Sequence, residues 1–144
     1  MRNTTYASLL AFLFLPLAGC GEAAPRIAEA EGVVLINNKP AEDIAVEFAP
    51  DPAKDTRGPV SSAITDSNGR FRLKTHKGQD GAVVGWHRVA LSDTKARQAT
   101  QEQLAAGKQG SSRIPDRYSV ASSSDIHKEV KEGKNDIQIA VTVP

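Results

Sequence analysis

The sequence predicts an all-β fold, a single seven-stranded β-sandwich with a short helical insertion. Apolar and polar residues alternate in short runs, most strictly at the end of the chain, where Ile137, Ile139, Val141 and Val143 take every second position. This is the pattern of a strand with one buried face. Turn residues (Gly, Asn, Asp, Pro) separate the runs. Aromatic residues are only 5% of the chain, so we expect a thin core of Val, Ile, Leu and Ala between β-layers.

The segment 1–19 is typical of a cleaved export signal. Arg2 and the amino terminus supply positive charge, and the apolar run 7–17 (ASLLAFLFLPL) follows. That run is well short of the ~20 residues that a membrane-spanning helix needs, and small residues follow it at once. Removal of the signal leaves roughly 125 of the 144 residues, which is the size of one domain.

The single cysteine of the chain, Cys20, lies where the apolar run ends. The segment 17–20 (LAGC) resembles the lipobox of bacterial lipoproteins, in which the chain is cut before the cysteine, the thiol is lipid-modified and the new amino terminus is acylated. The resemblance implies a membrane anchor at Cys20. The residues that follow predict a short linker over 20–26 and one domain over 27–144, because strand-like runs begin at Ile27. Several acyl chains hold a protein firmly where one does not, so we expect it on the cell membrane or outer membrane, facing the periplasm or the exterior. The alternative is an ordinary secretory signal with a chance cysteine.

Charge excludes one class of partner. The whole chain has 18 basic and 17 acidic residues, and loss of Arg2 with the signal makes the two numbers equal. A chain without net charge has no general attraction to nucleic acid. We therefore expect no nucleic-acid partner.

The first half of the domain reads as a series of strands. The run 26–36 (RIAEAEGVVLI) ends at the turn residues 37–40 (NNKP). In 44–48 (IAVEF) the large apolar side chains of Ile44, Val46 and Phe48 fall on one face, as expected of a half-buried strand. After a Pro-rich loop, 60–65 forms the next strand.

The segment 65–71 (TDSNGRF) admits two interpretations. Asp66 and Asn68 carry oxygens that suit a cation, yet Asp, Asn and Gly69 also have the backbone preferences of a hairpin turn. A calcium loop of the EF-hand type requires further acidic positions that this segment lacks. We interpret it as a turn that sets the register of a hairpin.

The run 85–92 (GWHRVALS) predicts a strand with two different faces. Its alternation places His87 with Val89 and Leu91 on one face, and Trp86 with Arg88 on the other. Because His87 shares a face with two apolar residues, we expect its side chain to point inward.

A short helix is expected after this strand, and two further strands end the chain. The stretch 93–107 (DTKARQATQEQLAAG) is rich in helix formers and ends at Gly107, a typical C-cap. It reads as an insertion between strands. The run 125–131 (DIHKEVK) predicts a strand, and the turn 133–136 (GKND) leads to the strictly alternating run that closes the domain.

Together these motifs resemble the carboxypeptidase regulatory-like family, which has a transthyretin-like seven-stranded sandwich. The stretches that carry the resemblance are Gly32-Val33-Val34, Asn38-Lys39-Pro40, Ile44-Ala45-Val46-Glu47-Phe48, Ala63-Ile64-Thr65-Asp66, Gly69-Arg70-Phe71, Gly81, Gly85-Trp86-His87-Arg88-Val89, Pro115 to Tyr118 and Gly133 to Asn135. The resemblance implies an accessory, adhesive or folding-support module with no assigned biochemical activity. Fold alone does not confer function.

The sequence contains no recognisable catalytic motif. We therefore expect that the protein is not an enzyme and that it binds no cofactor or metal. A hydrolase of hydroxyisourate shares the transthyretin-like architecture, but its carboxy-terminal Tyr-Arg-Gly-Ser has no counterpart here. The alternative is a small hydrolase or metal-binding protein that uses His76, His87 or His127. These residues do not have the short spacing that announces a zinc site.

Binding is the function that the residues favour. An exposed Trp86 beside Arg88, with Tyr118 nearby, is a candidate binding surface for a sugar or a peptide. For Trp86 itself we favour a second interpretation, in which its ring packs beneath the insertion 93–118. We therefore expect a non-catalytic binding or structural module of the cell envelope whose partner, besides the membrane at Cys20, is an envelope protein or a glycan.

Overall fold

The computed structural model describes residues 23–107 and 111–144, so the signal segment and Cys20 lie outside the described residues. Short strands account for most of the regular structure, together with one α-helix and two 3-10 turns. The strands are β1 (Ile27–Ala28), β2 (Ala30–Ile36), β3 (Lys39–Pro40), β4 (Ile44–Pro50), β5 (Ser61–Ile64), β6 (Arg70–Arg72), β7 (Lys74–Thr75), β8 (Ala82–Val83), β9 (Gly85–Asp93), β10 (His127–Val130) and β11 (Asn135–Val141). The helical elements are η1 (Pro52–Lys54), α1 (Thr94–Ala105) and η2 (Asp116–Tyr118).

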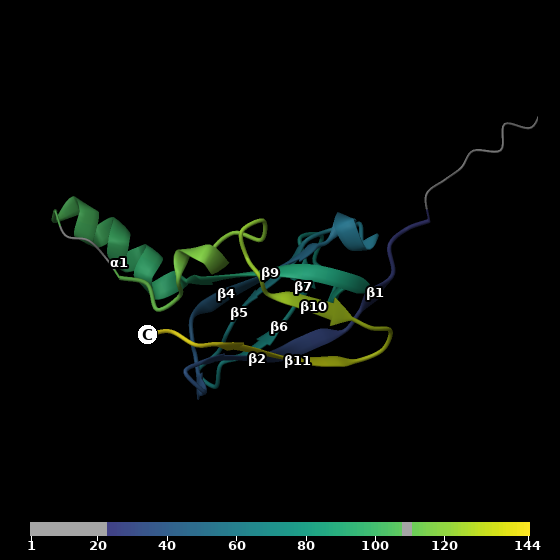
Figure 1. Cartoon of the computed structure of the whole chain (residues 1–144), viewed down its shortest axis with the longest axis horizontal. Coiled ribbons are helices and arrows are strands. Elements are labelled where there is room, and N and C mark those ends of the chain that lie inside the picture. Colours follow the sequence, from purple (N-terminus) through teal and green to yellow (C-terminus); the bar gives the residue numbers. More distant parts are fainter. Residues whose placement is uncertain (1–22, 108–110) are drawn as a thin grey trace, which may run out of the picture.

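Two sheets pack face to face, which confirms the all-β sandwich with a short helical insertion (Figure 1). The five-stranded sheet has the order β10-β9-β4-β5-β7, and the four-stranded sheet has the order β11-β2-β3, with β6 also paired to β2. Strands β1 and β8 form a separate pair. The described part of the chain contains more strands than the seven expected, because several are only two residues long.

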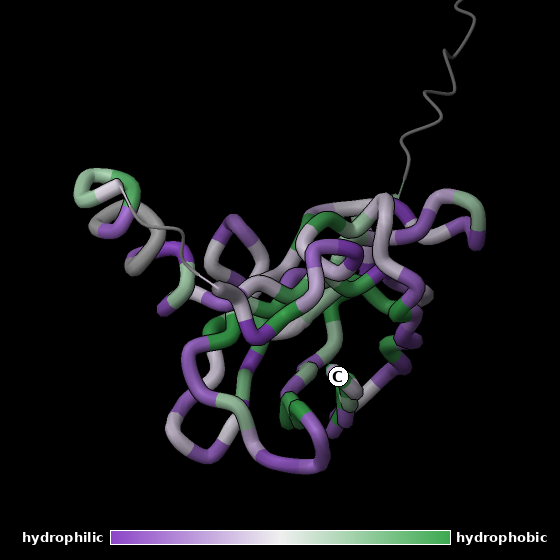
Figure 2. The backbone as a smooth tube through the Cα atoms, turned by 60° about the vertical axis from the view of Figure 1, so that its left-hand side comes forward, coloured by the Kyte–Doolittle hydropathy of each residue, from purple (hydrophilic) through white to green (hydrophobic). Residues whose placement is uncertain are grey.

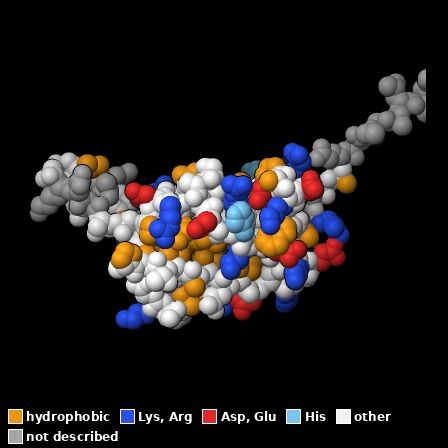
Figure 3. Space-filling view, in the orientation of Figure 1, with side chains coloured by type: hydrophobic (Ala, Val, Ile, Leu, Met, Phe, Trp, Pro, Cys, Tyr) orange, Lys and Arg blue, Asp and Glu red, His pale blue; other side chains and the backbone are white. Residues whose placement is uncertain are grey.

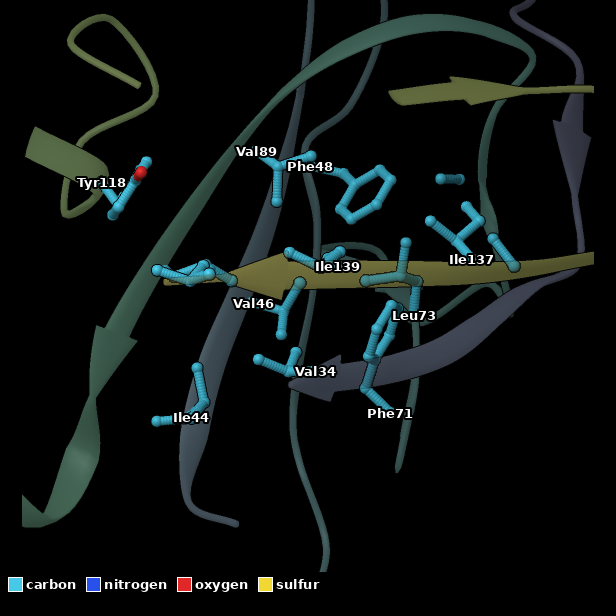
Figure 4. Close-up of a cluster of buried hydrophobic side chains, with 14 of the residues drawn as sticks. Val34, Ile44, Val46, Phe48, Phe71, Leu73, Val89, Tyr118, Ile137 and Ile139 are labelled. Carbon is cyan, nitrogen blue, oxygen red and sulfur yellow. The ribbon is translucent and has the colours of Figure 1, made fainter. Parts of the chain in front are cut away.

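The core lies between the sheets and is built mainly from aliphatic side chains. Figure 4 shows Val46 and Phe48 of β4 turned toward Val34 of β2 and Ile139 of β11. Along the tube of Figure 2, apolar segments run through the strands and hydrophilic segments form the turns. The alternation predicted for β11 is confirmed, because Ile137, Ile139 and Val141 are buried while the residues between them are exposed.

The centre of the four-stranded sheet is β2, which pairs with β11 in parallel and with β3 and β6 in antiparallel register. Gly32 lies opposite Ile137 on one side and Phe71 on the other. A Cβ atom at this position would overlap the carbonyl oxygen of Ile137 and lie 2.8 Å from Cζ of Phe71. The close approach of β11 therefore requires glycine here.

The segment 65–71 forms the predicted turn but not the predicted hairpin. Asp66 Oδ1 accepts hydrogen bonds from the amides of Asn68 and Arg70, both at 2.9 Å, and Gly69 has a φ of 70°. However, β5 before the turn pairs with β4 and β7, whereas β6 after it pairs with β2. The hairpin prediction was wrong because the turn carries the chain from one sheet to the other.

The predicted helical insertion is confirmed as α1, which extends away from the sheets (Figure 1). Asp93, the last residue of β9, caps it by accepting from the amides of Lys95 (3.1 Å) and Ala96 (3.3 Å). Arg113, which follows α1 in the chain, donates to the same carboxylate from Nε (2.7 Å) and Nη2 (2.9 Å). One buried carboxylate therefore fixes both the start of α1 and the segment after it to the sandwich.

We expect Asp93→Ala to lower the free energy of unfolding by about 2–3 kcal/mol, through loss of the cap and of the bonds from the partly exposed Arg113. Burial tends to raise the pKa of Asp93, but the hydrogen bonds from Arg113 and the amides outweigh it and lower that pKa. The ionised Asp93 carboxylate therefore contributes its full stabilisation above the ordinary aspartate pKa of about 3.9. This contribution is lost as the pH falls through the lower pKa that Asp93 has in the folded protein. Denaturant unfolding at pH 7 and pH 3 measures both effects, with Asp125→Ala as an exposed control. Equal losses in the two variants would contradict this role.

Candidate functional site

The outer face of the five-stranded sheet brings together two of the residues singled out from the sequence. Trp86 and Arg88 point away from the core on β9, while His87 between them is buried. On β10, Glu129 lies directly opposite Trp86, and His127 lies opposite Arg88. Figure 3 shows a histidine between basic and acidic side chains on the face over β9 and β10, with apolar atoms beside them.

The loop after β4 supplies a second cation. The Lys54 ammonium lies 3.9 Å from the centroid of the Trp86 ring, within the range of a cation–π contact. The Trp86 amide donates to Oγ1 of Thr56 at 2.8 Å, which fixes this loop to the start of β9. Trp86 thus lies half-buried against the η1 loop, so the favoured prediction that it packs beneath the 93–118 insertion was wrong.

A buried carboxylate lies beneath these side chains. Asp51 is only 2% exposed. Its Oδ1 accepts from the amide of Ala53 at 3.1 Å and so caps η1. Its Oδ2 lies 3.6 Å from Nε of Arg88 and 3.7 Å from Nδ1 of His127. We call Asp51, Lys54, Trp86, Arg88 and His127 the Trp86 cluster.

Sequence reasoning missed the role of Asp51. In the stretch 50–52 (PDP) it reads only as a residue that ends a strand. The charged partners come from β9 and β10, which are distant in sequence. The one local signal is the Asp-Pro pair, which is typical of a helix N-cap followed by proline at N1.

Tyr118 does not belong to this surface. It is 8% exposed and packs with Ile114 in the core. Its hydroxyl accepts from Nη2 of Arg117 at 2.8 Å, and the guanidinium of Arg117 lies 4.5 Å from the ring centroid. The expectation that Tyr118 extends the binding surface was wrong, because the η2 turn directs its ring inward.

The three histidines lie in different environments. His76 follows β7 and His127 is on β10. These strands are the two edges of the five-stranded sheet, about 19 Å apart at four strand spacings of about 4.8 Å. His87 lies in the core. In residues 23–107 and 111–144, no three His, Cys, Asp or Glu side chains are placed to hold a metal ion.

His87 is fully buried, as its alternation predicts. Its ring centroid lies 5.6 Å from that of Phe48, and Lys128 is opposite it on β10. Nδ1 lies 3.1 Å from the carbonyl oxygen of Gly85, which can only accept, so we assign the proton to Nδ1. In the described part of the chain Nε2 has no hydrogen-bond partner. Burial lowers the pKa of His87, and the bond to Gly85 opposes this more weakly.

A pH-dependent stability follows from His87. The unfolded imidazole has the ordinary pKa of about 6.5, so between this value and the lower folded pKa the unfolded state binds more protons. The free energy of unfolding is therefore expected to reach its full value above pH 6.5, where His87 is neutral in both states. It should decrease as the pH falls below 6.5. His87→Leu should flatten this slope between pH 7 and pH 5 in denaturant titrations. His76→Leu, at an exposed position, should keep the slope, and an unchanged slope in the His87 variant would exclude His87 as its source.

Two hollows lie elsewhere on the surface. One, of about 240 Å³, has charged walls that include Glu29, Glu31 and Asp80. These carboxylates pair with Lys134, Arg72 and Lys74 respectively. The other, of about 830 Å³, lies between the end of β9, α1 and the segment 112–119.

Comparisons with protein-family models, curated proteins and solved structures gave no match. Among the described residues, no helix has both the length and the apolar character needed to cross a membrane.

Proposed function

We propose that this chain is a lipid-anchored protein of the cell envelope that acts as a non-catalytic binding module. The binding surface is the outer face of β9 and β10 around Trp86 and Arg88. One observation carries the proposal: a half-exposed aromatic ring lies among three nitrogen-bearing side chains, close to the buried carboxylate of Asp51. The ring is that of Trp86, and the three side chains are those of Lys54, Arg88 and His127. Tryptophan and arginine are the residues that most often dominate binding surfaces.

Anchoring at Cys20 and membership of the carboxypeptidase regulatory-like family are parts of the same proposal. The lipobox 17–20 supports the anchor. The turn and strand motifs, together with the all-β sandwich, support the family. The alternative, a small hydrolase or metal-binding protein, gains no support from the separate positions of His76, His87 and His127.

The anchor is tested by the intact mass of the protein extracted from its native membrane. Acyl chains on Cys20 are expected, and they should be absent from a Cys20→Ser variant. An unmodified mass for the native protein would contradict the anchor.

The binding surface is tested by a photo-reactive residue at the exposed position 129, opposite Trp86, in the full chain in its native membrane. A discrete crosslink to an envelope protein or glycan is expected, and Trp86→Ala should abolish it. The same photo-reactive residue at the exposed position 39 is the control. Crosslinks that survive Trp86→Ala, or none at position 129, would exclude this surface.

A further inference from the structure

We propose that the Trp86 cluster binds an oxyanion, a carboxylate or phosphate group carried beside a flat apolar surface. The inference rests on the proposed function and names the ligand class for the same surface. Its physical basis is the arrangement of Asp51, Arg88, His127 and Lys54 around one aromatic ring.

Asp51 positions two of the donors. It is buried, and a buried carboxylate requires nearby positive charge or hydrogen bonds. Oδ2 faces Nε of Arg88 and Nδ1 of His127 at 3.6 and 3.7 Å. Asp51 therefore holds Arg88 through Nε and His127 through Nδ1. The other nitrogens of each side chain remain available to a ligand.

The remaining nitrogens of Arg88 and the ammonium of Lys54 are donors without acceptors. In the part of the chain that the structure describes, the two terminal nitrogens of Arg88, Nε2 of His127 and the Lys54 ammonium have no hydrogen-bond partner. The guanidinium fork of arginine matches the two oxygens of a carboxylate or phosphate group. His127 in its protonated form and Lys54 add further donors on the same face.

The cluster also has a polarity. Arg88 and His127 are directly opposite each other across the β9–β10 pair, whereas Glu129 lies opposite Trp86. An anionic group is therefore favoured at the Arg88 end and disfavoured beside Glu129. The part of the Trp86 ring that Lys54 does not cover is left to contact an uncharged, flat part of the ligand.

Three small probes separate the charge from the ring contact. Benzoate and phenyl phosphate carry an oxyanion on a flat ring, and benzamide is the neutral counterpart of benzoate. Trp86 is the only tryptophan in the chain, so its fluorescence reports binding to the full-length protein directly. We expect saturable changes with benzoate or phenyl phosphate and at least about tenfold weaker binding of benzamide. The tighter of the two anions identifies the oxyanion.

Matched variants locate the site. Arg88→Gln should weaken anion binding at least about tenfold. Arg72→Gln, which removes an exposed arginine on β6 that pairs with Glu31, should leave it unchanged. Glu129→Gln should strengthen it. Asp51→Asn should reduce the ratio of benzoate to benzamide affinity, a readout that a general loss of stability does not change.

Three outcomes would overturn the inference: equal affinities for benzoate and benzamide, equal effects of the two arginine variants, or no saturable response to any probe. Binding of benzamide as tight as that of benzoate, or crosslinks from position 129 without any response to the probes, would leave the proposed binding function standing while excluding the oxyanion. Absence of both crosslinks and probe binding would exclude the two together.

Discussion

Gly32→Ala is expected to lower the free energy of unfolding by about 3 kcal/mol or more, which is large for one methyl group. The new Cβ would overlap the backbone oxygen of Ile137, and a backbone atom in the middle of a paired strand cannot move aside as a side chain end does. Either β11 separates from β2 or the sheet bends at its centre. Thermal unfolding followed by circular dichroism should show a midpoint lower by roughly 10 °C or more.

Gly78→Ala is the matched control for that variant. Gly78 has a φ of 84° and no atom within 4 Å of an added Cβ, so its replacement brings only the cost of left-handed backbone, about 1–2 kcal/mol. If Gly32→Ala were no more destabilising than Gly78→Ala, the close approach of β2 and β11 would be excluded as the reason for glycine at position 32.

Phe48→Ala is expected to cost about 3–5 kcal/mol, because it removes a fully buried aromatic ring and leaves a cavity. Phe48 has no exposed surface. Its ring centroid lies 6.3 Å from that of Phe71 and 5.6 Å from that of His87, so it joins the two sheets. Chemical denaturation gives the loss directly.

Ile64→Ala is the control for the core variant. Ile64 is an apolar residue of β5 that is largely exposed, so its truncation should change the free energy of unfolding by no more than about 0.5 kcal/mol. Similar losses at positions 48 and 64 would contradict the packing of the two sheets around Phe48.

The elements of this fold could be predicted where the signal is local. The alternation in β11, the helix formers of α1 and the turn residues at 66–69 each specify a conformation within a few neighbouring residues. The partners of the strands could not be predicted in this way. The segment 65–71 has the chemistry of a tight turn whether the strands on either side share a sheet or not, and only tertiary packing decides between these outcomes.

The candidate site was predictable in part for the same reason. Alternation along one strand placed Trp86 and Arg88 on the same face and His87 in the core. It did not indicate that Asp51 would lie beneath Arg88, because that contact joins the end of β4 to β9. Nor did it indicate that Tyr118 would turn inward, since no periodic pattern surrounds the η2 turn.

The parallel pairing of β2 with β11 also bears on the order of events during synthesis. The partner of β2 is β11, which follows β3 and β6, the other strands of this sheet, in the sequence. A ribosome makes β11 after these strands, so the four-stranded sheet cannot close until β11 has been made. Domains dominated by such distant pairings fold slowly, in milliseconds to seconds. Late closure of this sheet would suit a chain that crosses a membrane unfolded, as the proposed lipid anchor requires.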